Sequence, residues 1–270
     1  MNEGNDTNQL RHRLARLERH HVAGDYPSAE RISYIAEVEG RRAFFVTADR
    51  YSHDWFYPRY SGGALHEPGL TRLMMSSLTP ESVFVDVGAH LGYFSIIAAL
   101  KARAVFAIEP QEFLIGRIHA NAAANHLTNV TTLHAAAGDA PGFARIPKVG
   151  SPVTKNGDSE NLVTMIRLDD YFTGAHQPTH LKIDTEGFEY HVLTGARRLL
   201  EARPVLFIEF HRGMERFGPG GVQLWDLLNE LGYRVTVGNH RRHEQASVFS
   251  EVPRAEITRY EGAMLVCQPR

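Results

Sequence analysis

The sequence contains almost no cysteine and no long hydrophobic run. Its single cysteine, Cys267, among 270 residues excludes a disulfide within the chain and any zinc or iron–sulfur site built from several cysteines. Its apolar runs, such as residues 93–100, fall far short of the roughly 20 residues that span a bilayer. Residues 1–9 are polar, so we expect no signal peptide. These absences predict a cytoplasmic protein without a membrane partner.

Neither sign of charge is in large excess. The 29 basic and 31 acidic side chains give a formal net charge of −2, so no overall positive field attracts nucleic acid, and we expect no such partner. Hydrophobic residues make up 43% and charged residues 22%, which is ordinary for a globular protein. The length fits one large domain or one domain with an appendage.

The first part of the chain has a mixed pattern. Leucines at helical spacing predict a short amphipathic helix over residues 10–17. Apolar residues alternate with polar ones over residues 32–38 and again at Phe44 and Val46, which predicts a hairpin. Residues 51–70, rich in aromatic residues, Gly and Pro, are interpreted as a connecting segment that packs on the main domain. We therefore predict an N-terminal extension, residues 1–79, ahead of a domain at residues 80–270.

From residue 81 onward, short apolar runs alternate with helical stretches. The expected helices are residues 93–102, 112–125 and 222–231, and residues 142–177 are expected to hold an insertion. Continuous apolar strands that alternate with helices indicate a parallel sheet covered on both faces. The predicted fold class is α/β, doubly wound, with a mostly parallel seven-stranded sheet. Its strands are Val83–Val87, Ala104–Ile108, Val130–Ala136, Leu181–Ile183, Pro204–Phe210, Tyr233–Val237 and Ala263–Cys267.

A glycine turn follows the first of these strands. The spacing is Asp86-x-Gly88-x-x-x-Gly92, between a buried strand and a helix, where ligands bind in such folds. A dinucleotide turn needs glycine at its first, third and sixth positions, and here the third is His90 and the sixth is Tyr93. No GxxxxGK[ST] pattern occurs, which excludes a P-loop. The turn therefore disfavours a nicotinamide cofactor and a nucleoside triphosphate.

The same spacing suits S-adenosylmethionine, which has no phosphate. Asp86 can orient the loop and favour the cationic end of this ligand. Backbone N–H groups at the start of the helix can receive the ligand's carboxylate. Taken alone, the pattern also fits a tight strand–helix turn in any α/β protein. The predicted cofactor loop consists of Asp86, Gly88, Ala89, His90 and Gly92.

Two further acidic residues lie at predicted strand ends. Glu109 ends the second strand, where a carboxylate can accept hydrogen bonds from both ribose hydroxyls. Asp139, after the third strand, is placed near the adenine amino group, although Gly-Asp pairs are also ordinary turn formers. Either carboxylate could instead be a simple loop acid; the preceding turn favours the ribose role for Glu109.

Several blocks of the sequence together resemble the FkbM-type methyltransferases. The most specific block is Lys182-Ile183-Asp184-Thr185-Glu186-Gly187, within a resemblance that covers residues 82–211. The resemblance implies S-adenosylmethionine as methyl donor and, mostly, hydroxyl groups of small molecules and sugars as acceptors. His90 replaces the usual Asn, Phe188 replaces the usual Ala, and Glu67 is similar to an acid often found ahead of the first strand. The matching blocks are residues 86–94, 108–110, 168–170, 181–189, 193–196 and 204–209.

The chemistry is expected at the ends of the fourth and fifth strands. Asp184, Glu186, Glu209 and His211 are predicted to converge there, because side chains two residues apart share one face of a strand. We place the base on Asp184 or His211, with Glu186 as the next candidate, and a rate that rises through about pH 6–7 if the base is histidine. Glu189 is interpreted only as a complement to a helix dipole.

Several alternatives remain open at this point. Asp184, Glu209 and His211 could hold a divalent metal, but no HxH, HxxxH or HExxH spacing supports one, so we expect none. Residues 213–221 are glycine-rich and are expected to form a mobile loop near the acceptor, and residues 240–243 a solvated basic loop. The leading interpretation is O-methylation of a hydroxyl on a small molecule, natural product or glycosyl group. N- or C-methylation, a catalytically silent S-adenosylmethionine-binding module, and a homo-oligomeric assembly are not excluded.

Overall fold

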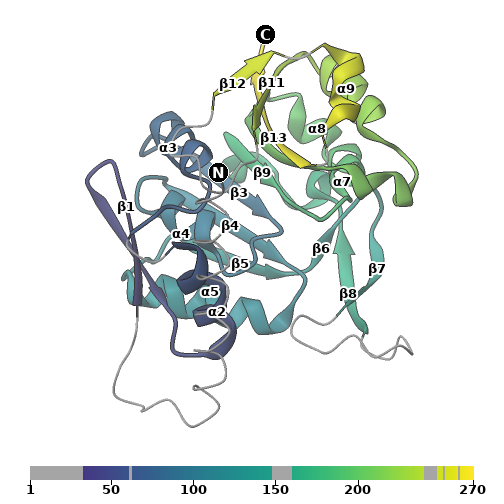
Figure 1. Ribbon diagram of the computed structural model, residues 1–270. Helices are drawn as coiled ribbons and strands as arrows, with labels where there is room; N and C mark the ends of the chain where they lie inside the picture. Colours follow the sequence, from purple (N-terminus) through teal and green to yellow (C-terminus); the bar gives the residue numbers. More distant parts are fainter. Residues whose placement is uncertain (1–32, 61–62, 148–159, 240–247, 252, 261) are drawn as a thin grey trace, which may run out of the picture.

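The protein is built around one large, mostly parallel sheet. The computed structural model describes residues 33–60, 63–147, 160–239, 248–251, 253–260 and 262–270 (Figure 1). Its main sheet has eight strands in the order β12-β11-β13-β10-β9-β3-β4-β5. All seven strands expected from the sequence are present, and β12 is a short addition at the edge. Their bounds are β3 (Val83–Val87), β4 (Ala104–Glu109), β5 (Val130–His134), β9 (His180–Ile183), β10 (Val205–His211), β11 (Tyr233–Asn239), β12 (Phe249–Glu251) and β13 (Gly262–Pro269).

The strand order creates a topological switch point at β3. Strands β5, β4, β3, β9 and β10 are mutually parallel, whereas β13 is antiparallel to both β10 and β11. The chain runs outward from β3 through β4 to β5 and then returns to β9 on the other side of β3. In open α/β sheets the crevice at such a reversal is where ligands bind. The topology therefore places the candidate site at the carboxyl ends of β3 and β9.

Helices cover both faces of the sheet and create two large apolar clusters. Along β3, Val85 belongs to one cluster and Phe84 to the other, as expected for a strand buried on both faces. The three helices expected in this domain are present, and their ends differ from the expected ones by up to three residues. The helices are α4 (Tyr93–Ala99), α5 (Glu112–Ala124), α6 (Leu168–Tyr171), α7 (Glu189–Thr194), α8 (Arg197–Leu200) and α9 (Gly221–Glu230).

The predicted hairpin forms, with a different inward face on its second strand. Strands β1 (Ser33–Val38) and β2 (Arg41–Val46) pair so that Ala43 lies opposite Ala36 and Phe45 opposite Tyr34. Ala43 and Phe45 are therefore buried, while Phe44, one of the two residues whose alternation predicted this strand, is 38% exposed. The two-residue turn sets this register, and a shift of one residue exchanges the two faces of a strand.

Residues 51–70 were wrongly interpreted as a connecting segment, because they include two helices. Helix α2 (Arg50–Tyr60) buries Ser52, Phe56 and Tyr60, which are spaced four residues apart and share one helix face. Helix α3 (Pro68–Ser77) begins with proline, which is favoured at the first position of a helix. The segment packs on the main domain through aromatic side chains, and the boundary at residue 79 stays a prediction.

The insertion forms a separate small sheet beside the main one. Strands β6 (Ala136–Ala137), β7 (Gly142–Pro147) and β8 (Glu160–Ile166) pair in the order β6-β8-β7 (Figure 1). The single strand expected at residues 130–136 is therefore divided between β5 and β6. The glycine-rich segment expected as a loop contains a 3₁₀ helix, η2 (Arg212–Phe217), and a second, η3 (Arg254–Arg259), precedes β13.

Some expected features lie outside the described residues. These are the helix at residues 10–17 and the basic run at residues 240–243. Among the helices that the structure describes, none combines the length and the apolar character needed to cross a membrane.

Candidate functional site

The glycine turn after β3 packs directly against the end of β9. Gly88 has a φ of 79°, and a Cβ atom there would lie 1.8 Å from the carbonyl oxygen of Asp184. Asp184 in turn donates its backbone N–H to the carbonyl oxygen of Val87, at 2.9 Å. Only glycine fits both the left-handed backbone and this close approach. The turn and the fourth strand end therefore form one compact structure at the switch point.

Asp86 connects three elements beneath this turn. It is fully buried at the end of β3, and its Oδ2 accepts a 2.6 Å hydrogen bond from Ser95 Oγ on α4. Its Oδ1 accepts no hydrogen bond from the described residues and lies 3.8 Å from Lys182 Nζ on β9. Through these contacts Asp86 connects β3 to α4 and β9; its predicted role in orienting the loop stays a prediction. Its contribution to the cationic end of a cofactor stays a prediction.

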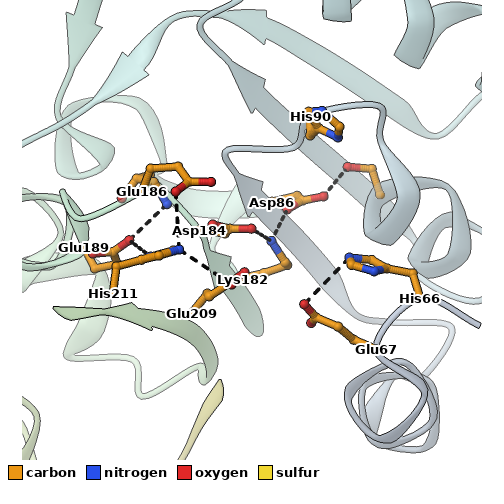
Figure 2. A network of polar contacts seen from close by, with 12 residues as sticks. His66, Glu67, Asp86, His90, Lys182, Asp184, Glu186, Glu189, Glu209 and His211 are labelled. Carbon is orange, nitrogen blue, oxygen red and sulfur yellow. Dashed lines mark hydrogen bonds and ion pairs between the residues drawn. The ribbon is translucent and has the colours of Figure 1, made fainter. Parts of the chain in front are cut away.

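Lys182 is a central residue of the site that the sequence reasoning missed. Its Nζ is buried between Asp86 and Asp184, 3.4 Å from Asp184 Oδ2, and lies 4.9 Å from the centre of the Phe94 ring (Figure 2). Burial lowers the pKa of Lys182, but the charges of Asp184 and Asp86 outweigh this and raise that pKa above the ordinary value. The sequence did contain a signal for this role, because Lys182 is a charged residue inside a short strand that was expected to be buried.

Glu109 lies beside the turn at the end of β4. Its side chain is buried, Oε2 accepts a hydrogen bond from His90 N at 2.8 Å, and Oε1 accepts one from Gln111 N at 2.9 Å. Burial raises the pKa of Glu109 to about 7, although these two hydrogen bonds act in the opposite direction. Each oxygen retains a second acceptor position, so the carboxylate can still receive ribose hydroxyls.

His90 connects the cofactor turn to the N-terminal extension. Its Nε2 lies 2.6 Å from Tyr51 Oη, and its ring centre is 5.3 Å from that of Trp55, both on α2. His90 has a φ of 54°, so a non-glycine residue occupies the left-handed region within the turn. The extension therefore contacts the turn itself, which no sequence motif indicated.

The remaining predicted cofactor residues occupy different surroundings. Glu67 immediately precedes α3, and its negative charge contributes to the raised pKa of Lys182, so it faces the same site. Asp139 is more exposed, and its Oδ2 lies 2.9 Å from His191 Nδ1. Gly92, with a φ of 78°, begins α4, and a Cβ atom there would approach Ile118 to 3.1 Å. The adenine role of Asp139 stays a prediction.

The acidic and imidazole groups expected at the acceptor side do lie together. Ligand atoms of Asp184, Glu186 and His211 all lie within 4.8 Å of one another. His211 Nε2 is 3.5 Å from Glu186 Oε2 and 3.6 Å from Glu209 Oε1, and Nδ1 is 3.0 Å from Glu189 Oε1 (Figure 2). We call these five residues the acidic rim. Its spacing would admit a divalent ion, although our expectation remains that none is required.

Electrostatics in the acidic rim favour bound protons. Burial lowers the pKa of His211, but the hydrogen bond to Glu189 and the charges of Glu189, Glu209 and Asp184 raise it to about 9. Burial raises the pKa of Asp184 well above its usual range, and Lys182 only partly opposes this. Both groups can therefore exchange a proton above the pH at which an ordinary carboxylate ionises.

The interpretation of Glu189 as a helix-dipole residue alone was incomplete. Glu189 does begin α7, but it is fully buried and bonds to His211 on another strand. Sequence reasoning missed this contact because helices α7 and α8 and strand β10 extend between the two residues in the sequence. Only the three-dimensional packing of α7 on β10 brings them together.

The turn fits S-adenosylmethionine on observations of this structure. Gly88 and Gly92 carry no Cβ atom at the two ends of the turn, Asp86 Oδ1 accepts no hydrogen bond from the described residues, and buried Glu109 has unused acceptor positions. The residues that would hold the cofactor are therefore Asp86, Gly88–Gly92 and Glu109, with Glu67 close to Lys182. These assignments are proposals for the individual residues.

The chain is similar to a known protein family and to several known proteins. The Methyltransferase FkbM domain model matches residues 86–235. Hexuronic acid methyltransferase AglP of Haloferax volcanii is 27% identical over 195 residues, covering 69% of this chain and 78% of that protein. Methyltransferase FkbM from Methylobacillus flagellatus is 20% identical with a TM-score of 0.46, covering 70% of this chain and 44% of that chain. M. jannaschii TYW2, solved in complex with AdoMet, is 13% identical with a TM-score of 0.47, covering 90% and 88%.

The family match carries the assignment. It begins at Asp86, in the glycine turn, and extends into β11, so it includes the switch point, the lysine-containing strand end and the acidic rim. It also covers more than half of the chain. The protein therefore belongs to the FkbM methyltransferase family and is an S-adenosylmethionine-dependent methyltransferase.

Proposed function

We propose that the protein methylates a hydroxyl group of a sugar or another small molecule. The observation that carries this proposal is the placement of two groups that can exchange a proton, Asp184 and His211, beside the strand end that contacts the cofactor turn. A neutral hydroxyl is a poor nucleophile, so proton removal during transfer contributes about 10²- to 10⁴-fold. An acceptor side rich in carboxylate and imidazole groups suits this requirement.

The proposed reaction is an in-line displacement. When bound in the turn, S-adenosylmethionine supplies a methyl group attached to a cationic sulfur. The acceptor oxygen forms the new carbon–oxygen bond, the carbon–sulfur bond breaks, and the hydroxyl proton passes to Asp184 or His211. Lys182 keeps Asp184 in place through their 3.4 Å ion pair, and Glu186 is the next candidate base. Positioning accounts for the rest of the rate.

The acceptor class rests on two considerations. The relative from Haloferax volcanii is, by its name, a hexuronic acid methyltransferase, which favours a glycosyl acceptor here. The formal net charge of −2 favours neither nucleic acid nor an anionic membrane as partner. N-methylation, C-methylation and a silent cofactor-binding module are the competing functions, and each makes a different product.

The test is transfer of an isotopically labelled methyl group to a panel of acceptors. The panel contains a neutral glycoside, the matching uronide, an amino sugar and a simple amine. The proposal predicts label on hydroxyl oxygen, located by mass spectrometry of the purified product. Label found only on nitrogen or carbon would contradict O-methylation, and cofactor binding without any transfer would indicate a binding module.

The proposal needs no metal ion. Lys182 already supplies a positive charge next to Asp184. Turnover should therefore persist in excess chelator, measured with the same labelled donor. Complete loss with EDTA, restored by magnesium or manganese, would instead assign Asp184, Glu186 and His211 as ligands.

A further inference from the structure

Glu189 has an unusual environment for an acidic residue at a helix start. It is the first residue of α7, yet its relative exposure is 0%. Glu112 occupies the matching position of α5 and is exposed, as is usual for a residue that only complements a helix dipole. Burial of a carboxylate is costly unless hydrogen bonds or an opposite charge compensate for it. The environment of Glu189 therefore requires a specific compensation.

That compensation is concentrated on one oxygen atom. Oε1 accepts hydrogen bonds from Thr185 N at 3.2 Å and Gly187 N at 2.9 Å, and it lies 3.0 Å from His211 Nδ1. Oε2 accepts no hydrogen bond from the described residues. Among the described residues, the imidazole of His211 is thus the one side chain that forms an ion pair with Glu189.

The two backbone contacts determine which nitrogen of His211 carries hydrogen. Backbone N–H groups can only donate, so Oε1 is an acceptor, and His211 Nδ1 must donate to it. When His211 is neutral, its lone pair is therefore on Nε2. Nε2 is the atom that faces Glu186 and Glu209 across the acidic rim. The hydrogen-bond pattern selects one tautomer and one ring orientation.

We propose that Glu189 is a positioning residue that holds His211 with Nε2 toward the acceptor. This inference rests on the proposed function, in which His211 is one of two candidate bases. The carboxylate holds the imidazole at Nδ1, and the opposite nitrogen is left to take the acceptor's proton. A carboxylate thus orients a histidine, as in other acid–base pairs, with Glu189 at the start of α7 and His211 at the end of β10.

The charged groups around His211 predict the direction of its titration. Asp184 and Glu186 follow β9, Glu189 begins α7 and Glu209 is on β10, so four carboxylates surround the imidazole. Cations also lie near these carboxylates: Arg216 on η2 donates to the backbone oxygen of Glu186, and Lys182 on β9 pairs with Asp184. Removing one of these negative charges lowers the pKa of His211, because an adjacent opposite charge stabilises the imidazolium.

Two substitutions separate orientation from charge. In Glu189→Gln, the amide oxygen takes the place of Oε1, because Thr185 N and Gly187 N both donate there. Orientation of His211 is thereby kept while the negative charge is lost. In Glu189→Ala both are lost. Glu112→Gln is the matched control, since it removes an acid from the first turn of α5 far from the acidic rim.

The first readout is nitrogen-15 NMR of His211 in the full-length protein without any acceptor. We expect Glu189→Gln to keep hydrogen on Nδ1 in the neutral ring and to lower the pKa of His211 by about 1–2 units. Glu189→Ala should give a mixture of tautomers. Glu112→Gln should leave both properties unchanged.

The second readout is the dependence of turnover on pH. The limb assigned to His211 should move to lower pH in Glu189→Gln by the same amount as the NMR titration. In Glu189→Ala, kcat should fall at least about tenfold at every pH, with a smaller change in the KM for the acceptor. Merely structural damage would not move the pH limb in this way.

The two proposals fail separately. An unchanged tautomer and unchanged pKa of His211 in Glu189→Gln and Glu189→Ala would overturn the positioning role, even if the wild type methylates hydroxyls. The expected NMR changes combined with label on nitrogen or carbon would overturn hydroxyl methylation and leave the positioning role intact. Because Glu189→Gln keeps the backbone hydrogen bonds, a folding failure of Glu189→Ala does not remove the test.

Discussion

At the scale of single residues, the site depends on Lys182. This buried cation is 3.8 Å from Asp86 and 3.4 Å from Asp184, and it therefore compensates one carboxylate on the cofactor side and one on the acceptor side. Removal of one partner from a buried ion pair leaves an uncompensated charge, which is more costly than loss of an exposed pair. Lys182 thereby links the two halves of the site energetically.

Replacing Lys182 with methionine should destabilise the protein by about 3–5 kcal/mol. The reason is that Asp86 and Asp184 would be left together in a buried site without a cation. Urea unfolding at neutral pH measures the change. Lys101→Met is a suitable control, because Lys101 pairs with the more exposed Glu39 and should cost at most about 1 kcal/mol through that pair. Equal losses for the two variants would contradict the account of Lys182.

Glu109 should make cofactor binding depend on pH. Its pKa is raised by burial to about 7, and the ionised form is the better acceptor for two ribose hydroxyls. The affinity for S-adenosylmethionine should therefore increase as pH rises through about 7, and Glu109→Gln should weaken binding by roughly 1.5–3 kcal/mol and remove this dependence. Calorimetry over a pH series tests this. A folded variant with wild-type affinity would exclude Glu109 from the cofactor site.

The same raised pKa has a consequence for stability. Glu109 retains its proton to a higher pH in the folded chain than in the unfolded chain. Its contribution to the free energy of unfolding must therefore decrease as pH rises from about 4.5 to about 7. Cofactor binding favours the ionised carboxylate. It should therefore make the free energy of unfolding decrease less steeply with pH.

Part of the site could be predicted from single residues, and part could not. Asp86, Glu109 and Asp184 were identifiable because the carboxyl ends of parallel strands meet at one edge of a sheet. Two further pairs, Lys182 with Asp86 and Glu189 with His211, join segments that are far apart in the sequence. No spacing rule relates such residues, because strand order and helix packing place them together.

At the scale of elements, the turn between β3 and α4 is the most constrained. A Cβ atom on Gly88 would lie 1.8 Å from the Asp184 carbonyl oxygen, and the backbone φ is positive. Some motif residues in other elements have a structural role. Asp169, for example, accepts hydrogen bonds from Arg198 N at 3.1 Å and Leu199 N at 2.8 Å, so it caps α8.

Gly88→Ala should destabilise the protein and abolish measurable cofactor binding. The added methyl group requires the ends of β3 and β9 to separate, and overpacking of this kind costs about 1–3 kcal/mol or more. Gly116→Ala provides the opposite control: Gly116 is exposed within α5 and has open space around it, so alanine should stabilise the protein by about 0.5–1 kcal/mol. Thermal unfolding and calorimetry measure both effects, and normal binding by Gly88→Ala would contradict the packing argument.

Some helices and strands could be predicted from the sequence more readily than others. Most strands of the main sheet are short, mainly apolar runs, as expected for buried strands, which is why all seven expected strands were found. Helix α2 was missed because its aromatic residues and Pro58 suggested an irregular segment, while its buried face at Ser52, Phe56 and Tyr60 is narrow. The buried face of β2 carries Ala43 and Phe45 and not Phe44, because the turn, rather than the apolar pattern, fixes its register.

At the scale of the whole molecule, the N-terminal extension shares a core with the main domain. One apolar cluster contains Phe45 and Phe56 of the extension together with Phe84 and Phe207 of the main sheet. Asn125, directly after α5, also accepts a hydrogen bond from Phe44 N at 2.8 Å and donates one to Phe44 O at 2.7 Å. The described residues 33–79 should therefore unfold together with the rest.

The two tryptophans allow this cooperativity to be measured. Trp55 is in α2 and Trp225 is in α9, so Trp225→Phe and Trp55→Phe leave one reporter in each region. We expect both reporters to give the same unfolding midpoint as circular dichroism. Asn125→Ala should shift both midpoints together, corresponding to about 1–3 kcal/mol. Earlier unfolding at Trp55 alone would show that the extension is an independent unit.

The most direct test of the central claim is transfer of a labelled methyl group to a hydroxyl-bearing sugar by two forms of the protein. The forms are the wild type and the double variant Asp184→Asn with His211→Ala, both at saturating S-adenosylmethionine. The account predicts a methyl ether from the wild type, and turnover reduced more than about tenfold in a double variant that still binds the cofactor. A wild type that methylates only nitrogen or carbon, or a double variant that turns over normally, would contradict it.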